Sequence, residues 1–74
     1  MNINPVGTNQ TELKLAPGRI VFFSYKTPVA AQIGDTFYKT TQKWSATTTR
    51  HVNNWIGAVT AEVKPQSFFD NLAS

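Results

Sequence analysis

Residues 19–25, with the sequence RIVFFSY, decide the fold of this chain. The stretch is rich in β-branched and aromatic residues, which favour an extended strand. A chain of 74 residues forms one small domain. Such a domain buries only about 60% of its unfolded surface, so a few large side chains must fill its core. We therefore expect this strand to lie at the centre of a sheet.

Turn signals before and after this strand predict its neighbours. Pro17-Gly18 marks a turn after the alternating residues 12–15, so a short strand precedes the central one. Thr27-Pro28 then interrupts the strand pattern, because proline donates no hydrogen bond to a neighbouring strand. Residues 1–11 are mostly polar and have no apolar period. We expect them to form a flexible arm, which leaves residues 12–74 as the folded domain.

A hairpin is predicted around residues 34–35, a Gly-Asp pair between two strand-like segments. The pair suits a two-residue turn because glycine adopts positive φ without strain. Pairing across such a turn places Ile33 opposite Thr36 and Ala31 opposite Tyr38.

Residues 44–57 form the clearest helix candidate, with Ser45 as the N-cap and Gly57 as the stop. One stripe at helical spacing is expected to pack on the sheet: Thr48, Val52, Trp55 and Ile56. The opposite side is polar and is expected to face water: Arg50, Asn53 and Asn54.

The C-terminal third predicts two further elements. Residues 59–64 alternate between apolar and polar and favour a last strand, although the alanines leave a continued helix open. Pro65 ends this element, and residues 67–72 have the cap and apolar residues of a short helix. The predicted fold is a single α+β domain. It has a largely antiparallel sheet of three to five strands, one main helix packed across the sheet and a short C-terminal helix.

The titratable residues argue against catalysis. The chain has four scattered carboxylates, one histidine and no cysteine, which excludes a thiolate zinc site and a multi-histidine metal centre. His51 beside threonine hydroxyls is the one conceivable base and nucleophile pairing, and its helical spacing argues against that role. We expect a non-enzymatic protein with no metal, no cofactor and no small-molecule substrate.

The sequence also suggests where the chain acts. No apolar run approaches the roughly 20 residues of a membrane span, and residues 1–5 lack the features of a secretory signal. An intracellular protein without a membrane partner is therefore expected.

Basic residues concentrate in the middle of the chain. Residues 14–50 carry six lysine or arginine residues against Asp35. Cations interleaved with aromatic residues suit a protein interface or nucleic acid, where they contact phosphates while the rings stack on bases. The candidate partner-binding residues are Lys39, Lys43, Trp44, Arg50 and Asn54. His51 borders the apolar stripe and is either structural, fixing the helix to the sheet through one ring nitrogen, or part of a binding site.

Three segments are distinctive as a set: residues 24–30 (SYKTPVA), 37–41 (FYKTT) and 43–55 (KWSATTTRHVNNW). Together they resemble a family of small, mostly uncharacterised proteins of tailed bacteriophages. The resemblance runs over roughly residues 20–56, and its sharpest element is the Thr-Thr-Arg-His stretch at residues 48–51. It implies a phage origin and action in the cytoplasm of an infected bacterium, and it supplies no activity.

Two functions are compatible with these features. We favour a protein that binds and modulates a host protein machine, either the transcription apparatus or a defence nuclease, since small phage proteins commonly occupy host surfaces. The alternative is direct nucleic-acid binding through the basic central segment.

Overall fold

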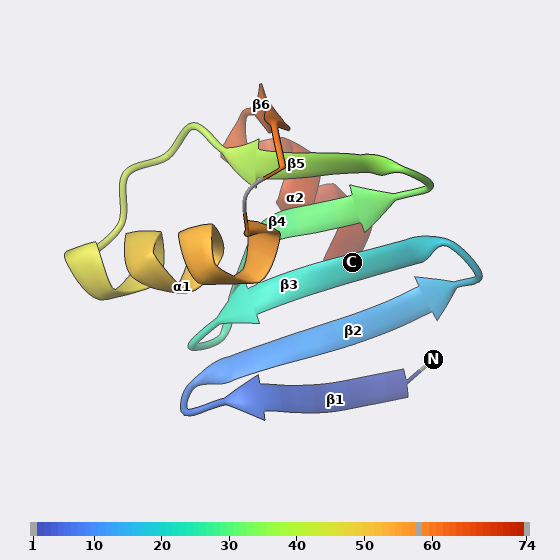
Figure 1. Cartoon of the computed structure of the whole chain (residues 1–74), viewed down its shortest axis with the longest axis horizontal. Helices are drawn as coiled ribbons and strands as arrows, with labels where there is room; N and C mark the ends of the chain where they lie inside the picture. Colours follow the sequence, from blue (N-terminus) through green and yellow to red (C-terminus); the bar gives the residue numbers. More distant parts are fainter. Residues whose placement is uncertain (1, 58, 74) are drawn as a thin grey trace.

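A computed structural model describes residues 2–57 and 59–73 of the chain. In these residues the chain forms six strands and two helices, and the strands lie in chain order in one sheet (Figure 1). In chain order the elements are β1 (Asn2–Gly7), β2 (Gln10–Ala16), β3 (Arg19–Ser24), β4 (Thr27–Ile33), β5 (Thr36–Thr40), α1 (Ala46–Ile56), β6 (Ala61–Lys64) and α2 (Gln66–Ala73). The α+β class is confirmed, and β3 lies inside the sheet between β2 and β4, as expected.

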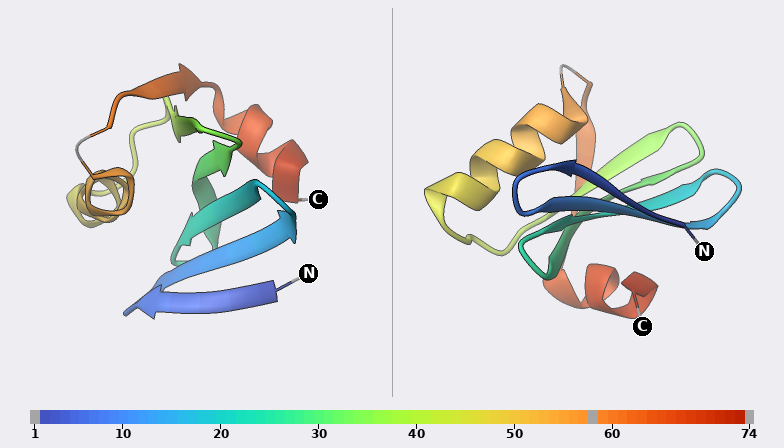
Figure 2. Two further views of the ribbon diagram at one scale, coloured as in Figure 1. Left: turned by 45° about the vertical axis from the view of Figure 1, so that its right-hand side comes forward. Right: turned by 90° about the horizontal axis from the view of Figure 1, so that it is seen from below.

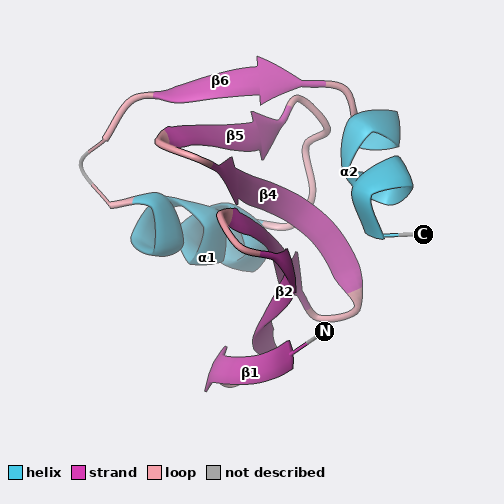
Figure 3. Ribbon diagram, turned by 90° about the vertical axis from the view of Figure 1, so that its right-hand side faces the viewer, coloured by secondary structure: helices cyan, strands magenta, loops and turns pink. Residues whose placement is uncertain are grey.

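The sheet differs from the prediction in strand number and in direction. It has six strands in the described residues, where three to five were expected, and β5 pairs with β6 in parallel. The parallel pair arises because α1 lies between the two strands and carries the chain back to the end of the sheet where β5 begins. Figure 3 shows β5 and β6 side by side. The other neighbouring pairs are antiparallel.

Residues 2–7 form β1 and β2 begins at residue 10, which corrects the expected flexible arm over residues 1–11 and the expected start of the domain at residue 12; residue 1 lies outside the described residues. β1 pairs with β2 in antiparallel register, with Ile3 opposite Leu13. The turn between them uses Asn9 with φ 59°, a conformation that asparagine tolerates. Ladder hydrogen bonds come from the backbone, so a segment without apolar alternation can still join a sheet edge. Pro5 is compatible with this position because β1 is an edge strand.

The predicted hairpin register is confirmed. Ile33 pairs with Thr36 and Ala31 with Tyr38. Thr27-Pro28, however, does not interrupt the sheet, since both residues belong to β4. The register between β3 and β4 instead shifts at Phe22 and Phe23, a bulge that accommodates the proline.

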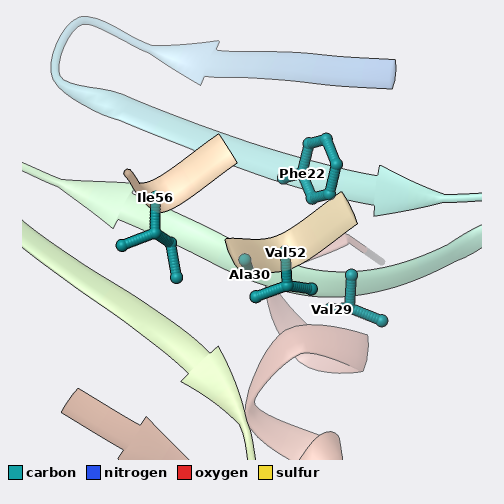
Figure 4. Close-up of a cluster of buried hydrophobic side chains, with 5 residues drawn as sticks. All are labelled: Phe22, Val29, Ala30, Val52 and Ile56. Atoms are coloured by element: carbon teal, nitrogen blue, oxygen red, sulfur yellow. The ribbon is translucent and has the colours of Figure 1, made fainter. Parts of the chain in front are cut away.

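The core lies on both sides of the sheet, because α1 and α2 cover opposite faces (Figure 2). On the α1 side, Phe22, Val29, Ala30, Val52 and Ile56 form a buried cluster (Figure 4). On the other side, α2 packs on β4 and β3 and contributes Phe69, which is fully buried. The predicted main helix and the predicted C-terminal helix are therefore both present.

The ends of α1 also match the prediction. Ser45 is the N-cap, and its hydroxyl accepts a hydrogen bond from the N–H of Thr48. Gly57 ends the helix with φ 75°, a conformation that favours glycine.

Trp55 connects α1 to the sheet. Its ring stacks on Phe22 at 5.0 Å between centroids, and Phe37 meets it edge-on at 5.7 Å. Its indole N–H donates a 2.6 Å hydrogen bond to the carboxylate of Glu12 in β2. Trp55 is half-buried, and it joins α1 to three strands.

Candidate functional site

A groove of about 450 Å³ lies between α1 and the sheet edge formed by β5 and β6. Lys39 of β5 is paired with Val63 of β6, so both side chains lie on the α1 side of the sheet and form the floor. Thr49 and Asn53 of α1 stand on one wall. The segment 41–44, which leads from β5 towards the helix, supplies the rest of the lining.

The groove is positively charged. Among its described lining residues, Lys39 and Lys43 carry charge and none is acidic. In residues 2–57 and 59–73, the structure records no salt bridge to either lysine. Both charges are therefore available to an anionic ligand, and the threonine, glutamine and asparagine side chains beside them supply hydrogen-bonding groups.

Trp44 stands at the groove with 43% of its surface exposed. Its indole N–H donates a 3.3 Å hydrogen bond to Oε1 of Gln66, at the start of α2. The ring is thereby held in place while much of its surface stays open to a ligand. A fixed, exposed tryptophan is a common anchor of binding interfaces.

The side chain of Gln66 makes hydrogen bonds to four residues, one of which is Trp44. Its Oε1 also accepts a 2.8 Å hydrogen bond from the hydroxyl of Thr40, the last residue of β5. Its Nε2 donates to the carbonyl of buried Pro28 at 2.7 Å and to the carboxylate of Asp70 at 3.1 Å. One side chain thus links β4, β5, α2 and the groove tryptophan. Gln66 was not predicted from the sequence, because a glutamine after a proline carries no signal of such a role.

The structure brings together three of the predicted binding residues and leaves out two. Lys39, Lys43 and Trp44 line the groove. Arg50 and Asn54 are exposed on α1 but do not line it. Asn53, which was expected only to face water, does line the groove.

His51 contacts the sheet through one ring nitrogen, the contact expected of its structural role. Its Nδ1 lies 2.9 Å from the hydroxyl of Ser24 at the end of β3. The same hydroxyl donates a 3.1 Å hydrogen bond to Oγ1 of Thr48.

The Ser24–His51 pair has the composition of a nucleophile and a base, but its placement favours structure. Ser24 is only 1% exposed, so its hydroxyl is closed to a substrate in this conformation. Fully satisfied buried polar groups of this kind fix the position of one element on another. Here they hold α1 against the end of β3.

We expect Ser24→Ala to lower the free energy of unfolding by about 1–3 kcal/mol, because it removes the hydrogen bonds to Oγ1 of Thr48 and Nδ1 of His51, and Oγ1 of Thr48 then keeps only its 3.4 Å hydrogen bond from Ser45. Urea unfolding followed by circular dichroism measures the change. The control is Arg50→Ala, an exposed substitution on the same helix, which should cost less than about 0.5 kcal/mol. Equal losses in the two variants would contradict the role of Ser24.

Within the described ranges, no cluster of three or more histidine, cysteine or acidic residues is placed to hold a metal ion. None of the helices there has the length and apolar character that crossing a membrane requires.

A protein-family model with the description "Family of unknown function (DUF8033)" matches residues 1–71. No curated protein and no solved structure matches the chain.

Proposed function

The chain belongs to this family, DUF8033, and we propose that it is a non-enzymatic, phage-encoded protein that binds a host protein machine through its basic groove. The ligand of the groove is an acidic segment of that machine, the transcription apparatus or a defence nuclease being the candidate targets. Binding in the host cytoplasm would then modulate the machine by occupying its surface.

The observation that carries this proposal is the unpaired charge of the groove. Lys39 and Lys43 line the groove together with a half-exposed tryptophan, and no acidic side chain among the described residues lines it to neutralise them. Charge complementarity of this kind steers association and selects partners of opposite sign. The apolar surface of Trp44 and Val63 provides the contact area that charges alone lack.

A single-stranded nucleic acid is the second candidate ligand of the same groove. An exposed tryptophan beside two lysines can stack on a base while the cations contact phosphates. The structure also weakens this alternative, because it places Arg50 outside the groove and leaves two cations there where the sequence had suggested three. Nucleic-acid affinity depends largely on the number of phosphate contacts.

The test removes the two groove charges and compares the result with a matched control. Lys39→Gln/Lys43→Gln takes two positive charges from the groove, and Lys14→Gln/Arg19→Gln takes two from exposed positions outside it. Each protein is used for affinity capture from bacterial lysate with and without nuclease treatment, and the partner captured from the treated lysate is then titrated. We expect the groove variant to bind at least about tenfold more weakly, a loss of about 1.4 kcal/mol, while the control stays near wild type.

Three outcomes would contradict the proposal. Equal weakening by both variants would show a general charge effect, and no weakening by either would place the interface elsewhere. Loss of the captured material on nuclease treatment would select the nucleic-acid alternative. In that case oligodeoxythymidine should bind directly, with log affinity falling against log salt at a slope of about −1.4 for two contacts.

A further inference from the structure

A hollow of about 270 Å³ lies on the part of the sheet formed by β1, β2 and β3, away from the groove. It is lined by Ile3, Thr11, Leu13, Phe23, Tyr25 and Lys26. Ile3 is opposite Leu13 and Thr11 is opposite Phe23 across neighbouring strands, so these side chains share one face. Phe22, next to Phe23, packs against α1, so the hollow opens on the opposite face.

The hollow is an open apolar surface. Leu13 is buried at its base, whereas Ile3 is 67% exposed and Tyr25 is 50% exposed. The helix on this face, α2, packs on β4 and β3, and β1 lies well beyond it (Figure 3). Exposed apolar residues that gather around a concavity are typical of a site that binds a partner.

Tyr25 occupies a backbone position that suits glycine better. It lies in the two-residue turn between β3 and β4 with φ 60°. Its N–H donates a 2.6 Å hydrogen bond to the carbonyl of Asn9 in the neighbouring turn, which holds this conformation. The backbone does not require a tyrosine here, since glycine would adopt the same φ without strain. What the tyrosine supplies is its ring, which also lies 6.0 Å from the ring of His51 in α1. A strained residue whose exposed ring lines a hollow indicates a binding role for that ring.

The residues that line the hollow indicate what kind of group it binds. Lys26 is charged, and no acidic residue lines the hollow among the residues that the structure describes. The occupant must therefore combine an apolar group with a negative charge. Addition of a whole strand to the edge of β1 is disfavoured, because Pro5 has no N–H and the register shifts between Pro5 and Gly7.

We propose that this hollow docks a segment of a partner protein through one large apolar side chain, with an adjacent carboxylate that pairs with Lys26. The apolar side chain contacts Ile3, Phe23 and Tyr25. The site lies on the face opposite α1, so it is separate from the groove and its occupation does not depend on the function proposed above. A chain with both sites can hold two protein surfaces at once.

The experiment is a selection of peptides from a random displayed library on the full-length chain. The expected peptides share a large apolar residue next to Asp or Glu. Their affinity should fall at least about tenfold for Ile3→Ser, which changes an exposed side chain. The groove variant Lys39→Gln/Lys43→Gln should keep full affinity. Selection repeated on Lys26→Glu should enrich Lys or Arg in place of the acidic residue.

Tyr25→Gly separates binding from folding. It relieves the positive φ but removes the ring contact with His51, so its melting temperature should stay near that of the wild type, while its peptide affinity should fall at least about tenfold. If this variant unfolds, the tyrosine is structural and its role in the proposal is wrong, while Ile3→Ser and Lys26→Glu still test the hollow.

Other results would overturn the proposal. Selected peptides that lack the apolar and acidic pair, or that bind Ile3→Ser normally, would show that the hollow is not their site. Failure to select any peptide would do the same. A wild-type dimer that Ile3→Ser converts to a monomer in sedimentation would identify the occupant as a second copy of the chain.

Discussion

Phe22→Ala is expected to lower the free energy of unfolding by about 3–5 kcal/mol, the cost of truncating a fully buried phenylalanine. Phe22 belongs to the buried cluster under α1 and also stacks on Trp55. The substitution therefore leaves a cavity and also removes a contact that holds α1 on the sheet. Small domains have about 0.05–0.15 kcal/mol of stability per residue. The loss therefore removes a large part of the total, and a substantial unfolded fraction should be visible without denaturant.

Urea unfolding of the Phe22→Ala variant measures this loss, and alanine at the neighbouring position 23 is the control. Phe23 is half-buried on the opposite face, so Phe23→Ala should cost clearly less than Phe22→Ala. Phe22→Leu should also be milder, since it retains most of the buried volume. Equal costs at positions 22 and 23 would contradict the larger contribution expected of the buried cluster under α1.

Gln66→Leu is expected to cost about 2–3 kcal/mol, although it changes no apolar residue and hardly changes the side-chain volume. The substitution removes four hydrogen bonds, among them the bond to the carbonyl of buried Pro28. Each ordinary hydrogen bond contributes about 1 kcal/mol net, and a buried group left without a partner costs more than that. The same change at exposed Gln42 should have almost no effect on stability.

A second substitution tests whether the amide nitrogen or the oxygen of Gln66 contributes more to stability. Gln66→Glu keeps the oxygen that accepts from Thr40 and Trp44 but loses the amide that donates to Pro28 and Asp70. It also places two carboxylates together. We expect it to be about as destabilising as Gln66→Leu. A stability near wild type would contradict the importance of the Pro28 contact.

The groove depends on Gln66 as well, because the hydrogen bond to Trp44 is made there. The sequence did not predict this dependence. Residues 44 and 66 are separated in the sequence by a helix and a strand, and they come within hydrogen-bond distance only in the folded chain. The same holds for Glu12 and Trp55, 43 residues apart.

The candidate site was predicted in part. Aromatic and basic residues close together in the sequence singled out Lys39, Lys43 and Trp44, and the structure gathers them because β5 leads directly into the segment before α1. Arg50 and Asn54 were included because a helix has a polar side. Which part of that side borders the groove depends on how α1 is rotated on the sheet, and the sequence does not specify that rotation.

The sequence by itself determined the elements whose signals are local. Ser45 and Gly57 bound α1 because a cap hydrogen bond and a positive φ involve only neighbouring residues. The Gly34-Asp35 turn sets the register of β4 and β5 because a two-residue loop leaves one way to pair them. The tertiary structure alone decided that β1 joins the sheet, that β6 runs parallel to β5 and that a groove and a hollow lie on opposite faces. Those features depend on which distant segments meet when apolar surface is buried and backbone hydrogen bonds are satisfied, and these conditions act on the chain as a whole.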